Sequence, residues 1–202
     1  MQSTISAKLS GPQAGTPYLE SALNTLHGRI ILSISATVLV AIGAHITLSL
    51  PFTPVPLVLS DFAVILVGLT LGPSTAFLTM LLYLAEGAVG LPVFSPQGLG
   101  GVAQLMGPTA GYLFAYPFAA AAAGQASRLA RLNMPHFTAA VVTGTLATAI
   151  ILLSGAGWLG HHYSRNLAVT WSMAVAPFLF GAAAKIVAAA LVYAPTRRWL
   201  RS

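Results

Sequence analysis

The sequence predicts an all-α, polytopic membrane protein with six transmembrane helices and both termini on the cytoplasmic side. Of its 202 residues, 56% are hydrophobic and only 6% are charged, and the mean hydropathy is +0.83. A soluble domain carries roughly a quarter charged residues, and a disordered chain combines low hydrophobicity with high charge. The composition therefore excludes both a cytosolic enzyme and a disordered chain. A span takes roughly 20 apolar residues, so the chain has room for about six spans joined by short loops.

Several chemistries lack the residues that they require. The net charge of +6 does not indicate a nucleic-acid partner, because basic residues flank the cytoplasmic ends of spans in any membrane protein. The absence of cysteine excludes disulfides and thiolate metal sites. Both lysines, Lys8 and Lys185, follow alanine, whereas a phosphate-binding loop needs Gly-Lys-[Ser/Thr]. No His-Glu-x-x-His zinc motif occurs either. We therefore expect neither an enzyme nor a metal protein.

The first predicted elements are a cytoplasmic tail and one span. Residues 1–28 are polar and contain glycines and prolines, and a short interfacial helix is expected over Pro17–His27. The first span is predicted from Ile30 to Leu50. It ends there because the prolines of the segment Pro51–Pro56 cannot continue a helix.

The next two spans form a predicted antiparallel pair. They run over Leu57–Leu71 and Pro73–Gly90, and the turn between them is only Gly72-Pro73. The following segment, residues 91–107, is too rich in glycine and proline for a helix and too apolar for a solvated loop. Such backbone is tolerated at membrane depth only where protein buries it or where it lines a cavity.

Two further spans follow on either side of a basic connector. We predict span four over Pro108–Ser127, the connector over Arg128–Pro135 and span five over His136–Leu159.

The last apolar stretch, Leu167–Ala194, is long for one span. Proline is favoured in a first helical turn, so span six is predicted over Pro177–Ala194. Residues 160–176 then form an outer loop with a short interfacial helix anchored by Trp171. The whole transmembrane domain covers residues 29–196, and residues 197–202 are a basic cytoplasmic tail.

The orientation follows from the distribution of basic residues. With both termini inside, a single basic residue, Arg165, lies outside, and Lys185 lies within a span. The cytoplasmic basic residues are Lys8, Arg29, Arg128, Arg131, Arg197, Arg198 and Arg201. An excess of lysine and arginine marks the cytoplasmic side, so we predict an N-in, C-in topology.

Three ionisable residues fall within predicted spans, where they are costly and mark candidate functional sites. They are Asp61 near the outer start of span two, Glu86 near the outer end of span three and Lys185 in span six. Lys185 lies eight residues into its span, or about 12 Å at 1.5 Å per residue. Three structural alternatives stay open: a helix cap for Asp61, a helix-to-helix pair for Glu86, and a lysine side chain that reaches the interface.

Two tyrosines lie near these residues. Tyr83 precedes Glu86 by three positions, so the two share a helix face, and Tyr112 lies near the outer end of span four. Either tyrosine could contact a ligand or simply pack in the core. The polar groups and both proline- and glycine-rich loops converge on the outer half of the protein, which predicts a pocket that opens outward.

Five segments resemble one family. They are Pro51-Phe-Thr-Pro-Val-Pro, Gly68-Leu-Thr-Leu-Gly-Pro73, Leu82-Tyr-Leu-Ala-Glu-Gly-Ala-Val-Gly-Leu-Pro-Val-Phe94, Gly100-Gly-Val-Ala-Gln-Leu-Met-Gly-Pro-Thr-Ala-Gly-Tyr112 and Ala176-Pro-Phe-Leu-Phe-Gly-Ala-Ala-Ala-Lys185. These segments resemble those of the BioY family. Its members are the substrate-binding (S) components of energy-coupling-factor (ECF) transporters for biotin. The resemblance covers nearly everything from residue 30 to 194 and implies the S-component bundle.

Two departures from the family pattern affect the expected ligand contacts. The family's last motif usually reads Pro-Phe-x-Pro-Gly-Asp-x-x-Lys, and its acid and lysine are expected to reach the biotin head group. Here Lys185 is present, but Ala182 stands at the acid position and Phe180 at the second proline. The first motif continues as Val58-Leu59-Ser60 in place of Thr-Leu-Gln, and Asp61 follows. Either Glu86 or Asp61 is a candidate for the missing carboxylate.

The resemblance implies high-affinity biotin capture in a bacterial cytoplasmic membrane. The protein would be the substrate-specific subunit of an ATP-driven transporter, with a transmembrane coupling subunit and two ATPase subunits as partners. Biotin is then the ligand and no cofactor is expected; the amides of Gln97 and Gln104 would serve its polar groups. The alternative is a self-sufficient carrier for biotin or a related vitamin, coupled to protons through Glu86 or Asp61.

A stripe of small residues in span one is the candidate partner surface. Ser33, Thr37 and Ala41 follow one another at intervals of four, which places them on one helix face. Small side chains let another helix approach closely in lipid, and the resembled family docks its coupling subunit on an Ala-x-x-x-Ala pattern in this span. The alternative is packing within the bundle.

Overall fold

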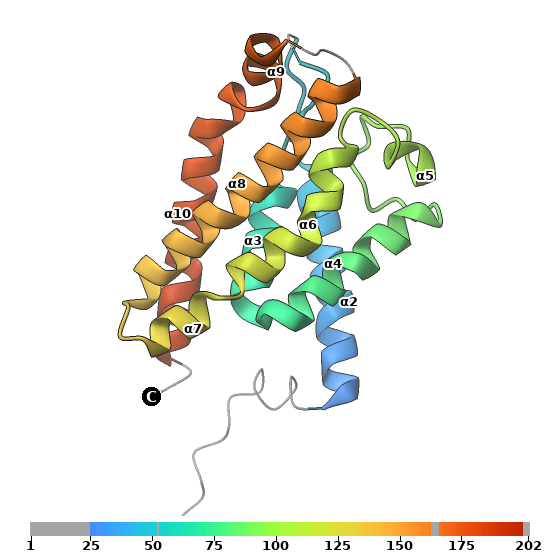
Figure 1. Cartoon of the computed structure of the whole chain (residues 1–202). Helices are drawn as coiled ribbons and strands as arrows, with labels where there is room; N and C mark the ends of the chain where they lie inside the picture. Colours follow the sequence, from blue (N-terminus) through green and yellow to red (C-terminus); the bar gives the residue numbers. More distant parts are fainter. Residues whose placement is uncertain (1–24, 52, 163–165, 200–202) are drawn as a thin grey trace, which may run out of the picture.

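The computed structural model describes residues 25–51, 53–162 and 166–199, and these form a helical bundle with one short pair of strands (Figure 1). Most of the predicted tail, with most of its interfacial helix, lies outside the described residues. The elements are α2 (Leu26–His45), β1 (Thr47–Leu48), β2 (Leu57–Val58), α3 (Ser60–Leu71), α4 (Pro73–Ala88), α5 (Gly101–Gln104), α6 (Ala110–Ala123), α7 (Ala126–Arg131), α8 (His136–His162), α9 (Leu167–Ala174) and α10 (Ala176–Trp199).

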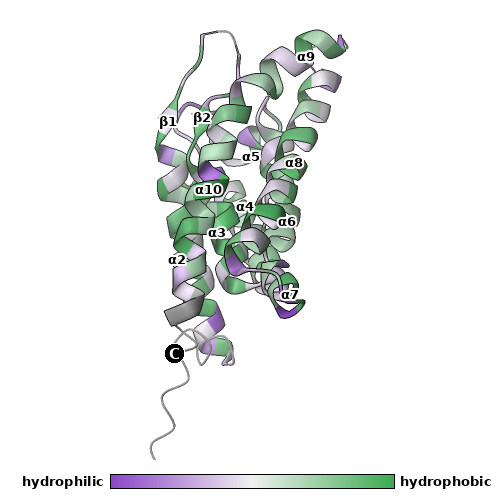
Figure 2. Ribbon diagram, turned by 90° about the vertical axis from the view of Figure 1, so that its left-hand side faces the viewer, coloured by the Kyte–Doolittle hydropathy of each residue, from purple (hydrophilic) through white to green (hydrophobic). Residues whose placement is uncertain are grey.

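Each predicted span corresponds to one of the longer helices: α2, α3, α4, α6, α8 and α10. Among the described residues, three helical stretches are long and apolar enough to cross a membrane: Leu26–His45, His136–His162 and Leu167–Thr196. Figure 2 shows how strongly hydrophobic the bundle is along its length. The chain is a membrane protein of mostly helical fold, and the number of its crossings and their orientation stay predictions.

The end of the first predicted span is wrong. α2 ends at His45 rather than Leu50, and the next residues form β1, which pairs antiparallel with β2. The carbonyl of Gly43 accepts hydrogen bonds from the amides of both Ile46 and Leu59, at 3.3 and 3.1 Å. This contact turns the chain away from the helix before the proline segment, and it also delays the start of α3 to Ser60.

Span four is also shorter than predicted. Only the residues of α6 are helical in one piece within the predicted span Pro108–Ser127. The predicted basic connector is partly helical, since both of its arginines belong to α7. The break lies at Gly124, where an added Cβ would be 2.5 Å from the backbone nitrogen of Pro73. Glycine here lets the end of α6 press against the turn between α3 and α4.

α10 extends to Trp199, beyond the predicted end of span six at Ala194 and into the predicted tail 197–202. Two predictions for the segments between the spans agree with the structure. Residues 91–107 contain only the single turn α5, and the short helix expected within residues 160–176 is α9. α8 extends to His162, slightly beyond its predicted end.

α6 lies at the centre of the bundle, packed against α8, α4 and α3. α10 packs on α8 and α3, while α2 packs on α3 and α4. The contacts are close because the facing residues are small: a Cβ on Gly68 would lie 2.4 Å from the carbonyl oxygen of Ala120. We call the end that holds residues 46–51, 53–59, 89–109 and 166–175 the loop end. The opposite, connector end holds the Gly72-Pro73 turn, α7 and both ends of the described chain (Figure 1).

Candidate ligand-binding site

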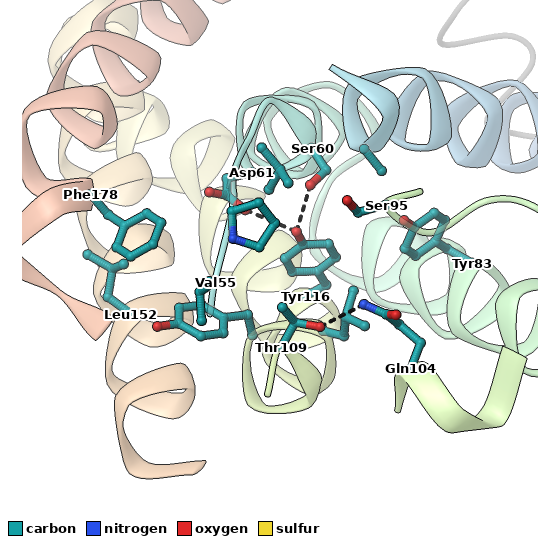
Figure 3. A pocket seen from close by; sticks show the side chains of 15 residues that line it. Val55, Ser60, Asp61, Tyr83, Ser95, Gln104, Thr109, Tyr116, Leu152 and Phe178 are labelled. Carbon is teal, nitrogen blue, oxygen red and sulfur yellow. Dashed lines mark hydrogen bonds between the residues drawn. The ribbon is translucent and has the colours of Figure 1, made fainter. Parts of the chain in front are cut away.

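A cavity of about 40 Å³ lies between the helices towards the loop end (Figure 3). We call it the inner cavity. Every helix that matches a predicted span contributes to its wall, together with the two loops of the loop end. Its lining residues are Ala44, Val55, Pro56, Val58, Ser60, Asp61, Tyr83, Ser95, Gln104, Thr109, Tyr112, Leu113, Tyr116, Leu152 and Phe178.

Asp61 is the centre of a polar cluster in this wall. One carboxylate oxygen accepts a hydrogen bond from the hydroxyl of Tyr116 at 3.0 Å, and the other lies 3.1 Å from Nζ of Lys185. The Tyr116 hydroxyl is also 2.8 Å from the hydroxyl of Ser60. A hydroxyl has one proton to donate, so Ser60 donates to Tyr116 and Tyr116 donates to Asp61. Asp61 therefore does more than cap a helix, because its carboxylate joins side chains from α6 and α10.

Lys185 reaches this cluster from α10. Its ammonium donates to the carbonyl of Val58 as well as to Asp61. The relative exposure of the two charged side chains is 16% for Lys185 and 23% for Asp61. Lys185 does not line the inner cavity; it lies behind Asp61, in a small adjoining space that Ala182 also lines. Asp61 thus places a carboxylate beside the lysine where Ala182 offers none.

Aromatic rings form the apolar walls. The hydroxyls of Tyr83 and Tyr112 donate to the backbone carbonyls of Val93 and Ala174, each at 2.8 Å. Because both hydroxyls are satisfied by backbone, these tyrosines offer the cavity mainly their ring surfaces. Tyr112 fits against Gly155, where an added Cβ would lie 2.2 Å from the ring.

The amides predicted as ligand contacts occupy two different places. Gln104 is buried, and its Nε2 donates to the Thr109 hydroxyl at 2.8 Å. Gln97 is exposed and accepts from the Ser95 hydroxyl. Gln97 lines a second cavity of about 230 Å³, which we call the vestibule. The inner cavity and the vestibule share Pro56, Ser95, Gln104 and Thr109.

Glu86 lies outside both cavities. Its carboxylate accepts a hydrogen bond from Thr37 at 3.1 Å and lines a separate groove between α2 and α4. At about 100° per residue, a separation of three leaves Tyr83 and Glu86 some 60° apart around the helix. Tyr83 consequently points into the bundle while Glu86 points towards α2, so the structure does not bring Glu86 to Lys185.

The stripe of small residues on α2 faces α4 in part. Ser33 accepts a hydrogen bond from Thr79 at 2.9 Å, and Thr37 is buried against Glu86. Both hydroxyls are hydrogen-bonded within the bundle, which favours packing as the role of Ser33 and Thr37, and docking of a partner on this stripe stays a prediction. Ala41 is half-buried and lines the groove.

Sequence reasoning missed Tyr116 and Ser60 as members of the polar cluster. Tyr116 follows Tyr112 by four residues, which places both on one face of α6, and Ser60 directly precedes Asp61. Those two spacings were the available signals.

A comparison with protein families matches residues 17–202 to the model of the BioY family. The chain belongs to the BioY family. This family comprises transporter components rather than enzymes, and the matched range includes all the residues that line the inner cavity.

Individual relatives cover most of this BioY-family chain. The probable biotin transporter BioY of Pyrococcus horikoshii is 37% identical over 76% of this chain and 86% of that protein. The biotin transporter BioY of Thermotoga maritima is 34% identical over 77% and 88%, respectively. A solved structure, the S-component for biotin from an ECF-type ABC transporter, has a TM-score of 0.75 at 22% identity and covers 84% of this chain and 90% of that one. The fold is therefore that of an S component.

Proposed function

We propose that this protein captures biotin at the outer side of a bacterial cytoplasmic membrane and delivers it as the substrate-specific subunit of an ATP-driven transporter. The observation that carries the proposal is the Asp61 cluster in the wall of an otherwise largely apolar, aromatic cavity. The names of the relatives support the choice of ligand.

The cluster suits the head group of biotin. Its ureido group has two N–H donors and one carbonyl acceptor, attached to an apolar bicycle. Asp61 can accept from a ureido N–H, and the hydroxyls of Ser60 and Tyr116 lie beside it. Lys185 holds and neutralises the carboxylate from behind, while Tyr83, Tyr112 and Phe178 surround the rings. Enclosure with every buried polar group paired favours high affinity.

The placement in the membrane is supported by the arrangement of the helices. Both ends of the described chain lie at the connector end together with α7 (Figure 1), as six alternating crossings require. Arg29 is near the start of α2, and α7 contains two further arginines. Lysine and arginine mark the cytoplasmic side, so the inner cavity faces outward. The sequence has no phosphate-binding loop, so in this proposal the energy is supplied by a transmembrane coupling subunit with two ATPase subunits.

Calorimetry with biotin on the purified protein in detergent tests the binding site. We expect tight binding by the wild type and a loss of about 2–5 kcal/mol in Lys185→Met, because the carboxylate of Asp61 loses its counter-charge. Glu86→Gln is the matched control, since Glu86 lies outside both cavities. Wild-type protein that binds no biotin, or Lys185→Met with unchanged affinity, contradicts the proposed site.

Uptake measurements test the energy source. In cells that express the chain with a coupling module, ATP depletion should stop biotin uptake, whereas an uncoupler at constant ATP should not. The opposite result favours a proton-coupled carrier. Glu86 is the candidate for that role, because among the described residues no cation lies within ion-pair distance of it.

A further inference from the structure

Among the described residues that line the inner cavity and the vestibule, there is no lysine or arginine to face a ligand. Among the described residues, Asp61 is the single charged side chain that lines the inner cavity, and none lines the vestibule. Lys185 is turned away towards the far side of Asp61, where two acceptors already engage it. Within the part of the chain that the structure describes, a ligand carboxylate therefore meets no complementary charge in either space.

The geometry also fixes the direction in which a ligand's tail leaves the inner cavity. In Figure 3 the Asp61 and Ser60 side chains lie on one side of the Tyr116 ring, and the hydrogen-bonded pair Gln104–Thr109 lies on the other. Gln104 and Thr109 belong to the wall shared with the vestibule. A head group held at Asp61 thus directs its tail past Gln104 into the vestibule.

We infer that the site accepts biotin joined through its carboxyl group to an amine, that is, biotin amides such as biotinyl-lysine, about as well as free biotin. This inference rests on the proposed function. Burying an unpaired carboxylate is costly, so the free acid gains nothing from entering a neutral vestibule. An amide is uncharged, and the serine, threonine and glutamine side chains there can both donate to it and accept from it.

Calorimetry on the purified full-length chain in detergent compares biotin, biotinamide and biotinyl-lysine. We expect the three dissociation constants to agree within about fivefold. If both amides bind about a hundredfold more weakly than biotin, the carboxylate is recognised by a cation and the inference is wrong. A chain that binds none of the three refutes the proposed function itself, which is a different result.

Two substitutions in the vestibule separate tail recognition from head-group binding. Ala103→Phe fills part of the vestibule without touching the inner cavity, and should weaken biotinyl-lysine about tenfold more than biotinamide. Val102→Phe is the control, because Val102 is exposed on the same turn and lines neither cavity. Gln97→Arg supplies a cation and should create a preference of about tenfold for biotin over biotinamide.

These variants also define the results that overturn the inference. Equal losses for all three ligands in Ala103→Phe, together with an unchanged ratio of biotin to biotinamide in Gln97→Arg, would place the tail elsewhere. If Ala103→Phe does not fold, the ratio in Gln97→Arg alone decides the question.

Discussion

Moving the carboxylate of the polar cluster from α3 to α10 is the sharpest test of the site. Asp61→Asn removes the counter-charge of Lys185, and Ala182→Asp installs an acid on α10, three residues before that lysine. Positions three apart share a helix face, and Ala182 lines the same small space as Asp61 and Lys185. The two substitutions together should rebuild the charge pair from the other helix.

The magnitude follows from the pair's geometry. Two unit charges separated by the observed 3.1 Å attract by about 5 kcal/mol at an effective dielectric constant of 20, and dehydration of the two groups cancels part of this. We expect Asp61→Asn to weaken biotin binding by about 2–4 kcal/mol, or roughly 30- to 1,000-fold in Kd. Adding Ala182→Asp should recover at least about tenfold. Ala182→Asp alone should weaken binding, because two carboxylates then compete for one ammonium.

The assay is calorimetry on each single variant and the double variant, with thermal unfolding measured in parallel to confirm that each is folded. Glu86→Gln controls for the loss of a carboxylate elsewhere, and its biotin affinity should stay within about twofold of the wild type. Additive losses in the double variant would show that Ala182 and Asp61 do not serve the same lysine. That result would refute the reasoning.

Three further predictions concern single residues. Tyr116→Phe deletes the hydroxyl between two members of the cluster and should cost about 1–3 kcal/mol of biotin affinity by calorimetry; an unchanged Kd would exclude this hydroxyl from the site. Gly155→Ala puts a Cβ within 2.2 Å of the Tyr112 ring, and we expect it to lower both the unfolding temperature and the affinity, at a cost of about 1–3 kcal/mol. No change in either would mean that the ring adjusts freely. Ala41→Trp should abolish ATP-driven uptake and co-purification of the coupling subunit while leaving biotin binding in detergent intact. Normal uptake would contradict docking at Ala41, and loss of folding would place it in the bundle.

The helix boundaries that lie at prolines could be predicted from the sequence, because proline imposes its conformation locally. α4 begins at Pro73 as expected, and α10 begins within one residue of Pro177. The end of α2 could not be predicted in this way. Residues 46–50 are largely apolar and could continue the helix. What stops it is the contact of Gly43 with Leu59, sixteen residues further on.

For the site, the position of each residue along its helix could be predicted from the sequence, but the rotation of each helix about its own axis could not. Counting residues from span ends placed Asp61, Glu86 and Lys185 in the same half of the protein. Which acid meets the lysine depends on how α3, α4 and α10 are turned relative to one another, and no local pattern encodes that. Tyr116 was missed for a related reason, because a tyrosine in an apolar helix has the same sequence pattern whether its hydroxyl meets a carboxylate or backbone.

The shortness of three central helices has a consequence for how this protein can diversify. α3, α4 and α6 contain 12, 16 and 14 residues, or about 18, 24 and 21 Å, against a hydrocarbon layer of about 30 Å. Irregular backbone at the loop end adds to the length of these helices. The outer surfaces of the long helices are thus the parts whose length and hydrophobicity must suit the lipid bilayer. The side chains of the loops and adjoining helix ends are the parts that must fit the ligand. Substitutions in those loops can change which small molecule fits while the close helix packing, built on Gly68 and its alanine neighbours, stays as it is.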